Sequence, residues 1–156
     1  MFLFLDFDGV LHPQYDGVPT PVGEVFCHLS LFESIMRDFP HVEIIISSTW
    51  RYQFSIEELR SKFSPDIAGR IVGMTPQTEH DEREYVQARR EVEILEWLAI
   101  SGRSDAAWIA LDDAAWLFDK HRDRLVHCTW YVGLNDEVEL KLKSALASLV
   151  YTASNF

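Results

Sequence analysis

Short hydrophobic runs that end in polar residues recur along the chain. Three of them, at residues 2–5, 42–46 and 106–111, each lead directly into charged or hydroxyl side chains. Runs of this length that are rich in β-branched and aromatic residues favour buried strands. Residues 71–74 and 125–128 favour two shorter strands of the same kind.

Helical patterns alternate with these runs. Amphipathic spacing predicts helices over residues 24–39, 91–101 and 135–150, and Gly102 is a stop signal for the second of them. Ser55 and Glu58 form a capping-box pattern that opens a short helix through about Phe63. Strands that alternate with helices predict an α/β fold with a parallel sheet.

The polar residues that follow the strands are candidates for chemistry. Ligands of open α/β sheets bind beyond the carboxyl ends of the strands, so these residues can converge. A buried strand followed by an Asx/Gly turn explains Asp8 and Gly9, but it does not explain Asp6. A carboxylate placed after four apolar residues loses solvation, and a bound cation would compensate for that loss.

These residues match an ordered set of motifs, and the chain resembles the haloacid dehalogenase (HAD) superfamily. Within it, the chain is similar to a small capless branch that includes the HAD domains of bacterial RNA-repair proteins. The resemblance implies a Rossmann-like three-layer α/β sandwich with a central, mostly parallel sheet and no large cap domain. The four motifs fall on Asp6, Asp8 and Gly9; on Ser47; on Arg90, with Arg89 left open; and on Asp112 and Asp113.

The resemblance also implies a reaction, the Mg²⁺-dependent hydrolysis of a phosphate monoester through an aspartyl phosphate. Asp6 would be the nucleophile and Asp8 the general acid and base. Ser47 and Arg90 would hold the phosphoryl oxygens. Mg²⁺ would be bound by Asp6, the carbonyl of Asp8, and Asp112 and Asp113; Gly9, Ser48 and Arg51 would contact substrate.

Several side chains near the motifs have two interpretations. Arg51 either clamps phosphate or pairs with a nearby carboxylate. Trp50 and Tyr52 either stack a base or pack against the sheet. His12 either assists proton transfer or is an ordinary loop histidine. Trp130 favours packing, with substrate contact as the alternative.

Intervals between the motifs limit the architecture. Residues 12–22 are rich in turn formers, and the resemblance implies a flap there after the first motif. The interval before the second motif is too short for a large lid. Residues 75–87 are polar and charged and predict a solvated loop or the entrance to a helix, with a substrate-gating loop as the alternative.

Composition predicts one domain over residues 1–156, since 156 residues with 47% hydrophobic content build one sizeable core. The chain starts in a strand without a leader, and no apolar run is long enough to span a bilayer, so we expect a cytoplasmic protein. Cys27 and Cys128 lack metal-ligand spacing and are expected to be reduced core thiols.

The net charge of −11, from 14 basic and 25 acidic residues, argues against long nucleic acid as a general partner. A phosphorylated small molecule, a nucleotide or a single nucleic-acid end remains open as the partner, and no membrane partner is expected. Two other functions also remain open, namely phosphotransfer to an acceptor other than water and a non-catalytic partner-binding module.

Overall fold

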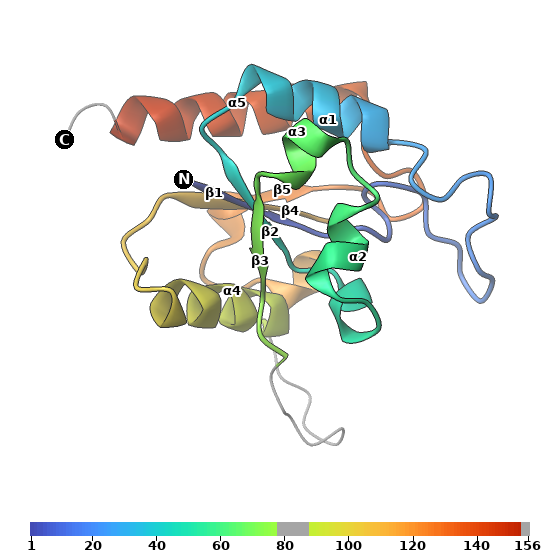
Figure 1. Cartoon of the computed structure of the whole chain (residues 1–156), viewed down its shortest axis with the longest axis horizontal. Helices are drawn as coiled ribbons and strands as arrows, with labels where there is room; N and C mark the ends of the chain where they lie inside the picture. The colour runs from blue at the N-terminus through green and yellow to red at the C-terminus, as the bar shows by residue number, and fades with distance from the viewer. Residues whose placement is uncertain (78–87, 154–156) are drawn as a thin grey trace.

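A parallel sheet with the strand order β3-β2-β1-β4-β5 forms the middle layer of the molecule (Figure 1). The computed structural model describes residues 1–77 and 88–153, with side chains to residue 149. The strands are β1 (Phe2–Leu5), β2 (Glu43–Ile46), β3 (Ile71–Met74), β4 (Trp108–Asp112) and β5 (Leu125–His127). The α-helices are α1 (Leu29–Asp38), α2 (Ile56–Arg60), α3 (Pro65–Ala68), α4 (Arg89–Ile100) and α5 (Asp136–Ala153).

β1 is the central strand, and its register places the candidate residues at one edge. Leu5 pairs with Ile46 of β2 and with Leu111 of β4, all in parallel. The residues that follow these three positions therefore emerge side by side. All described strand pairs are parallel, which confirms the predicted α/β fold.

Alternation along β1 divides the core into two faces. Leu3 and Leu5 belong to the larger cluster, which is shared with α1, α3 and α5, whereas Phe2 and Phe4 belong to the smaller cluster under α4. Trp97 of α4 contacts the rings of both phenylalanines edge-on, at 5.3 and 5.7 Å between centroids. Figure 1 shows α1, α3 and α5 on one side of the sheet and α4 on the other, which is the predicted three-layer sandwich.

The helix predicted over residues 24–39 is wrong at its start, since α1 begins only at Leu29. Phe26 adopts a left-handed conformation with φ 60°, which interrupts the helical backbone. Its ring packs against Phe7 and Trp50, at 5.5 and 5.2 Å, so tertiary packing outweighs the helical pattern here. The same turn leaves Cys27 exposed, and the expectation that it is a core thiol is wrong; Cys128 is buried.

Local signals elsewhere were more reliable. The capping box at Ser55 and Glu58 is formed in both directions, although α2 ends at Arg60 rather than at Phe63. Gly102 follows α4 with φ 70°, the conformation that terminates helices. Sequence patterns missed α3, whose one signal is a proline at its first turn. Residues 75–77 have no regular structure, and the rest of the predicted loop lies outside the described residues.

No large cap is present within residues 1–77 and 88–153. The segment between β1 and α1 is a flap of turns, closed by an isolated antiparallel bridge between Tyr15 and Val18. Among the described helices, none combines the length and the apolar character that crossing a bilayer requires.

Candidate active site

Three buried carboxylates meet where β1 and β4 end. Asp6, Asp112 and Asp113 each offer one oxygen, and these oxygens lie within 4.8 Å of one another. The side chains belong to residues that are only 5%, 1% and 6% exposed. The sequence predicted this convergence, and the parallel register of β1 with β4 produces it.

Gly9 makes the approach of Asp113 possible. Its backbone has φ 69°, and a Cβ built at this position would collide with the carboxylate of Asp113. The chain then turns back, because the N–H groups of Val10 and Leu11 both donate to the carbonyl of Phe7, at 3.1 and 2.8 Å. The predicted bend after Asp8 is therefore present, and it requires glycine.

Arg90 is the cation of the cluster. Its Nη1 lies 3.1 Å from Oδ2 of Asp112 and 3.5 Å from Oδ1 of Asp6, and the residue is 5% exposed. Burial opposes the charge, but Asp112 and Asp6 outweigh it and raise the pKa of Arg90 above its ordinary value. The side chain of Arg89 is 43% exposed and faces Glu93 at 3.7 Å. Of the two arginines, Arg90 is the one at the carboxylates.

Ser47, the first serine after β2, contacts the same nitrogen of Arg90 as the aspartates do. Nη1 of Arg90 donates to the Ser47 carbonyl at 2.6 Å and lies 3.3 Å from the Ser47 hydroxyl. The Ser48 hydroxyl accepts from the N–H of Trp50 at 3.4 Å and caps the short 3₁₀ helix η1 (Thr49–Tyr52). Ser47 therefore adjoins the cluster, whereas the contact observed for Ser48 is structural.

Arg51 is held by the protein itself. Its guanidinium donates to the carbonyls of Ser47, Ser48 and Thr75, at 2.6, 2.9 and 3.1 Å, and to Oε2 of Glu93 at 2.7 Å. The side chains of Arg51 and Glu93 are each 3% exposed. The sequence left two roles open for Arg51, clamping a phosphate or pairing with a nearby carboxylate. The structure shows the second of these, with Glu93 as the partner.

Asp8 receives two N–H donors. Trp50 donates its indole N–H to both oxygens, at 3.1 and 3.0 Å, and Nε2 of His12 lies 3.0 Å from Oδ1. The Phe26 N–H donates to Nδ1 of His12 at 3.3 Å, which assigns the ring proton to Nε2. Burial opposes ionisation, but the bonds from His12 and Trp50 outweigh it and lower the pKa of Asp8 below 3.8.

The electrostatics of the carboxylates fit a divalent cation. Burial, followed by Asp6 and Asp112, raises the pKa of Asp113 to about 7, and burial also raises the pKa of Asp112. Oδ2 of Asp112 lies close to Arg90, but it accepts no hydrogen bond from the described residues. An orphaned oxygen in a set of hard oxygen donors is what Mg²⁺ would satisfy.

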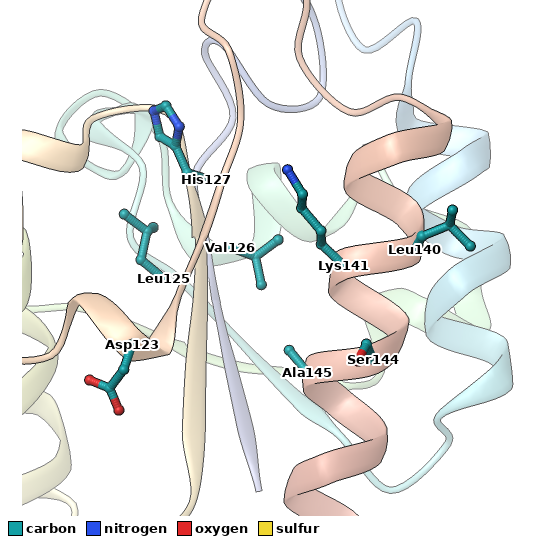
Figure 2. Close-up of a pocket in the computed structure, with 8 residues that line it drawn as sticks. All are labelled: Asp123, Leu125, Val126, His127, Leu140, Lys141, Ser144 and Ala145. Atoms are coloured by element: carbon teal, nitrogen blue, oxygen red, sulfur yellow. The ribbon is translucent and has the colours of Figure 1, made fainter.

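Small hollows surround the cluster. Hollows of about 390, 320 and 170 Å³ are lined in turn by Asp8, by Asp113 and by Arg90, each with residues of neighbouring loops. A larger hollow, of about 640 Å³, lies between β5 and α5 (Figure 2). Its walls include Leu125, Val126 and Leu140 and none of the clustered aspartates, so this hollow is separate from the carboxylate cluster.

The sequence did not predict which side chains form hydrogen bonds to the candidate site residues. The bonds from Trp50 and His12 to Asp8 were not anticipated, because they depend on how η1 and the flap fold back on β1. Glu93, the partner of Arg51, was missed as well. One signal was available, since Glu93 lies three residues after Arg90 and so shares its helix face.

Comparison with known proteins gives one family. The family model described as "HAD domain in Swiss Army Knife RNA repair proteins" matches residues 2–138. No curated protein and no solved structure matches the chain.

Proposed function

The chain belongs to the family of HAD domains found in Swiss Army Knife RNA repair proteins, and we propose that it is a Mg²⁺-dependent phosphomonoester hydrolase. Membership supports a phosphohydrolase or phosphotransferase kind of function. The main support for a Mg²⁺-dependent hydrolase is the cluster of Asp6, Asp112 and Asp113 beside Arg90. Asp8 follows Asp6 by two residues.

Asp6, Asp112 and Asp113 would hold Mg²⁺ together with the carbonyl of Asp8. The bound metal would neutralise the carboxylates, and as a Lewis acid it would polarise the phosphoryl oxygens. Oδ2 of Asp112 supports this assignment, because it is buried beside Arg90 yet accepts no hydrogen bond from the described residues.

Asp6 would attack phosphorus in line and form an aspartyl phosphate as the bond to the leaving oxygen breaks. Arg90 and the Ser47 hydroxyl would stabilise the phosphoryl oxygens. Asp8 would protonate the leaving oxygen and then take a proton from the water that hydrolyses the intermediate. Before the first step, Asp8 must gain the proton that it later transfers.

Two other functions remain as alternatives. Transfer of the phosphoryl group to another acceptor uses the same first step, so phosphotransfer differs only in what attacks the intermediate. A non-catalytic binding module needs no acid or base, and the two N–H bonds that orient Asp8 argue against that alternative. The family description favours a nucleic-acid end as substrate, and the charge of −11 favours a short one.

The experiment is a screen of phosphomonoesters with and without Mg²⁺ that measures released phosphate and transferred phosphoryl groups separately. We expect release that depends on Mg²⁺ and that Asp6→Asn abolishes. Asp105→Asn is the matched control, because Asp105 is an exposed aspartate outside the site. Beryllium fluoride should inhibit the native protein by mimicking the aspartyl phosphate.

The outcomes separate the alternatives. Transfer to an added alcohol in excess of release would indicate a phosphotransferase. Full activity in a folded Asp6→Asn protein would exclude the covalent mechanism. Absence of both reactions across the screen would favour the binding module.

A further inference from the structure

We propose that the hollow beside Asp113 is a subsite for one planar, uncharged ring on the leaving group, such as the base of a nucleotide. The flap hollow, as we call it, has a volume of about 320 Å³ and is lined by Gln14, Tyr15, Asp16, Gly17, Asp113, Trp116 and Trp130. The inference rests on the proposed function and adds the class of leaving group that the site accepts.

Aromatic side chains from separate parts of the chain meet in the flap hollow. Tyr15 comes from the flap, Trp116 from the 3₁₀ helix η2 (Ala115–Leu117) and Trp130 from the loop between β5 and α5. Trp116 is 58% exposed and Trp130 is 38% exposed. Large rings left open to solvent beside a catalytic cluster are typical of a binding surface rather than of packing.

The walls of the flap hollow are fixed by contacts of their own. Gln14 N–H donates to the Trp130 carbonyl at 2.8 Å, which ties the flap to the opposite loop. Tyr15 donates its hydroxyl to Glu24 at 2.5 Å, and the Trp130 ring packs edge-on against Tyr131 at 5.2 Å. Tyr15 and Trp130 are thus held in place before any ligand arrives, which lowers the entropic cost of binding.

The charge of the flap hollow selects against a second phosphate. Among the described residues, its lining contains two acidic side chains, Asp16 and Asp113, and neither lysine nor arginine. A second phosphate there would face the carboxylate of Asp16 and would have no basic side chain to pair with. An uncharged ring gains stacking contacts and brings no charge, and the volume lies at the lower end for ligand pockets, enough for one nucleoside.

The position of the flap hollow relative to the chemistry fits a leaving group. Asp113 belongs both to the carboxylate cluster and to the hollow, so a phosphate at the cluster has its ester group within reach of the rings. The flap also begins at the general acid, since Asp8 and His12 form an isolated bridge just before Gln14. The flap that lines the hollow therefore follows the proposed general acid closely in sequence.

The test compares substrates that differ only in the ring. Adenosine 5′-monophosphate is compared with ribose 5-phosphate, and adenosine 3′-monophosphate with ribose 3-phosphate, by kcat/KM. Stacking on an aromatic side chain is worth about 1–3 kcal/mol, so we expect the nucleotide to be preferred by about 5- to 150-fold in at least one pair. Trp116→Ala should bring that ratio toward one, whereas Trp116→Phe should keep most of it.

Leu140→Ala is the matched control, because Leu140 is 71% exposed and lines the hollow between β5 and α5 instead. Thermal denaturation of each variant verifies that it is folded. If the ratio is near one in both pairs, or if Trp116→Ala leaves it unchanged, the subsite is wrong while the hydrolase proposal stands. If no substrate is hydrolysed, the proposed function fails. In that case, tryptophan fluorescence measures the equilibrium binding of each nucleotide and of its matched sugar phosphate. The ratio of their Kd values then tests the subsite as the ratio of kcat/KM values would have done.

Discussion

Trp50 donates its indole N–H to both carboxylate oxygens of Asp8, at 3.1 and 3.0 Å, across 42 residues of sequence. The indole is itself held in an aromatic cluster, with Phe7, Phe26 and Phe54 at 5.8, 5.2 and 5.5 Å between ring centroids. A packed ring thus fixes the direction of the carboxylate that we propose as general acid. Trp50 is a positioning residue, since it would act through Asp8.

Trp50→Phe keeps a ring in the cluster and removes the donor. We expect kcat on alkyl phosphates to fall by about 10- to 100-fold, because a misdirected acid protonates the leaving oxygen poorly. The loss should be smaller on p-nitrophenyl phosphate, whose leaving group needs little protonation. Trp97→Phe, on the opposite face of the sheet, is the control. Equal losses on both esters would mean that Trp50 only supports the fold.

Arg90 and Arg89 offer a matched pair for the cation of the site. Arg90→Met removes the only cation placed against Asp6 and Asp112 among the described residues, and we expect the metal-free protein to lose about 3–5 kcal/mol in free energy of unfolding. Arg89→Met, at an exposed position, should lose less than about 1 kcal/mol. Urea denaturation with a chelator measures both values. Similar losses in free energy of unfolding for the two variants would contradict the assignment of Arg90 as the cation of the carboxylate cluster.

Stability of the metal-free protein should depend on Asp113 and pH. Burial, Asp6 and Asp112 raise the pKa of Asp113 from 3.8 to about 7 in the folded state. The folded state binds this proton more tightly than the unfolded state does. Protonation of Asp113 therefore contributes to the free energy of unfolding, fully below about pH 3.8, and this contribution is lost as the pH rises through about 7. The Tm of Asp113→Asn, measured with a chelator, should therefore exceed that of the native protein by more at pH 8 than at pH 5.

Added Mg²⁺ should reverse the order of the two Tm values, so that the native protein becomes more stable than Asp113→Asn. It neutralises the carboxylates, so it should raise the Tm of the native protein by mass action and that of Asp113→Asn much less. Asp105→Asn should respond to Mg²⁺ as the native protein does. A Tm difference that is independent of pH and of Mg²⁺ would place the metal elsewhere.

Chain length of the substrate provides a further prediction. The net charge of −11 repels every phosphate beyond the reacting one, so end-phosphorylated mononucleotides or short oligonucleotides should have higher kcat/KM than long strands. The gap should narrow as salt screens the repulsion. A length series at two ionic strengths measures this effect. Higher kcat/KM on long strands at low salt would reveal a basic track outside the site.

The sequence predicted the strands and the motifs well, because both depend on local patterns. Apolar runs placed Asp6, Ser47 and Asp112 at strand ends, and parallel pairing then brought those ends together. The sequence predicted the start of α1 poorly, since Phe26 leaves the helical conformation to pack its ring on Phe7 and Trp50. The backbone conformation of Phe26 thus depends on contacts between segments that are distant in sequence.

The supporting contacts of the site were the least predictable part. Arg51 was equally compatible with phosphate and with a carboxylate, and only the position of Glu93 on α4 distinguishes the two. Likewise, Gly9 suggested a bend, but the reason that it must be glycine is the carboxylate of Asp113, which is more than 100 residues away in sequence.

Trapping the aspartyl phosphate tests the central claim most directly. In Asp8→Asn, p-nitrophenyl phosphate should still phosphorylate Asp6, while hydrolysis of the intermediate slows because the water lacks its base. Acid quenching and borohydride reduction would convert a phosphorylated aspartate to homoserine, which mass spectrometry locates. Homoserine is expected at position 6. Homoserine at position 8, 112 or 113, or turnover that persists in a folded Asp6→Asn protein, would contradict it.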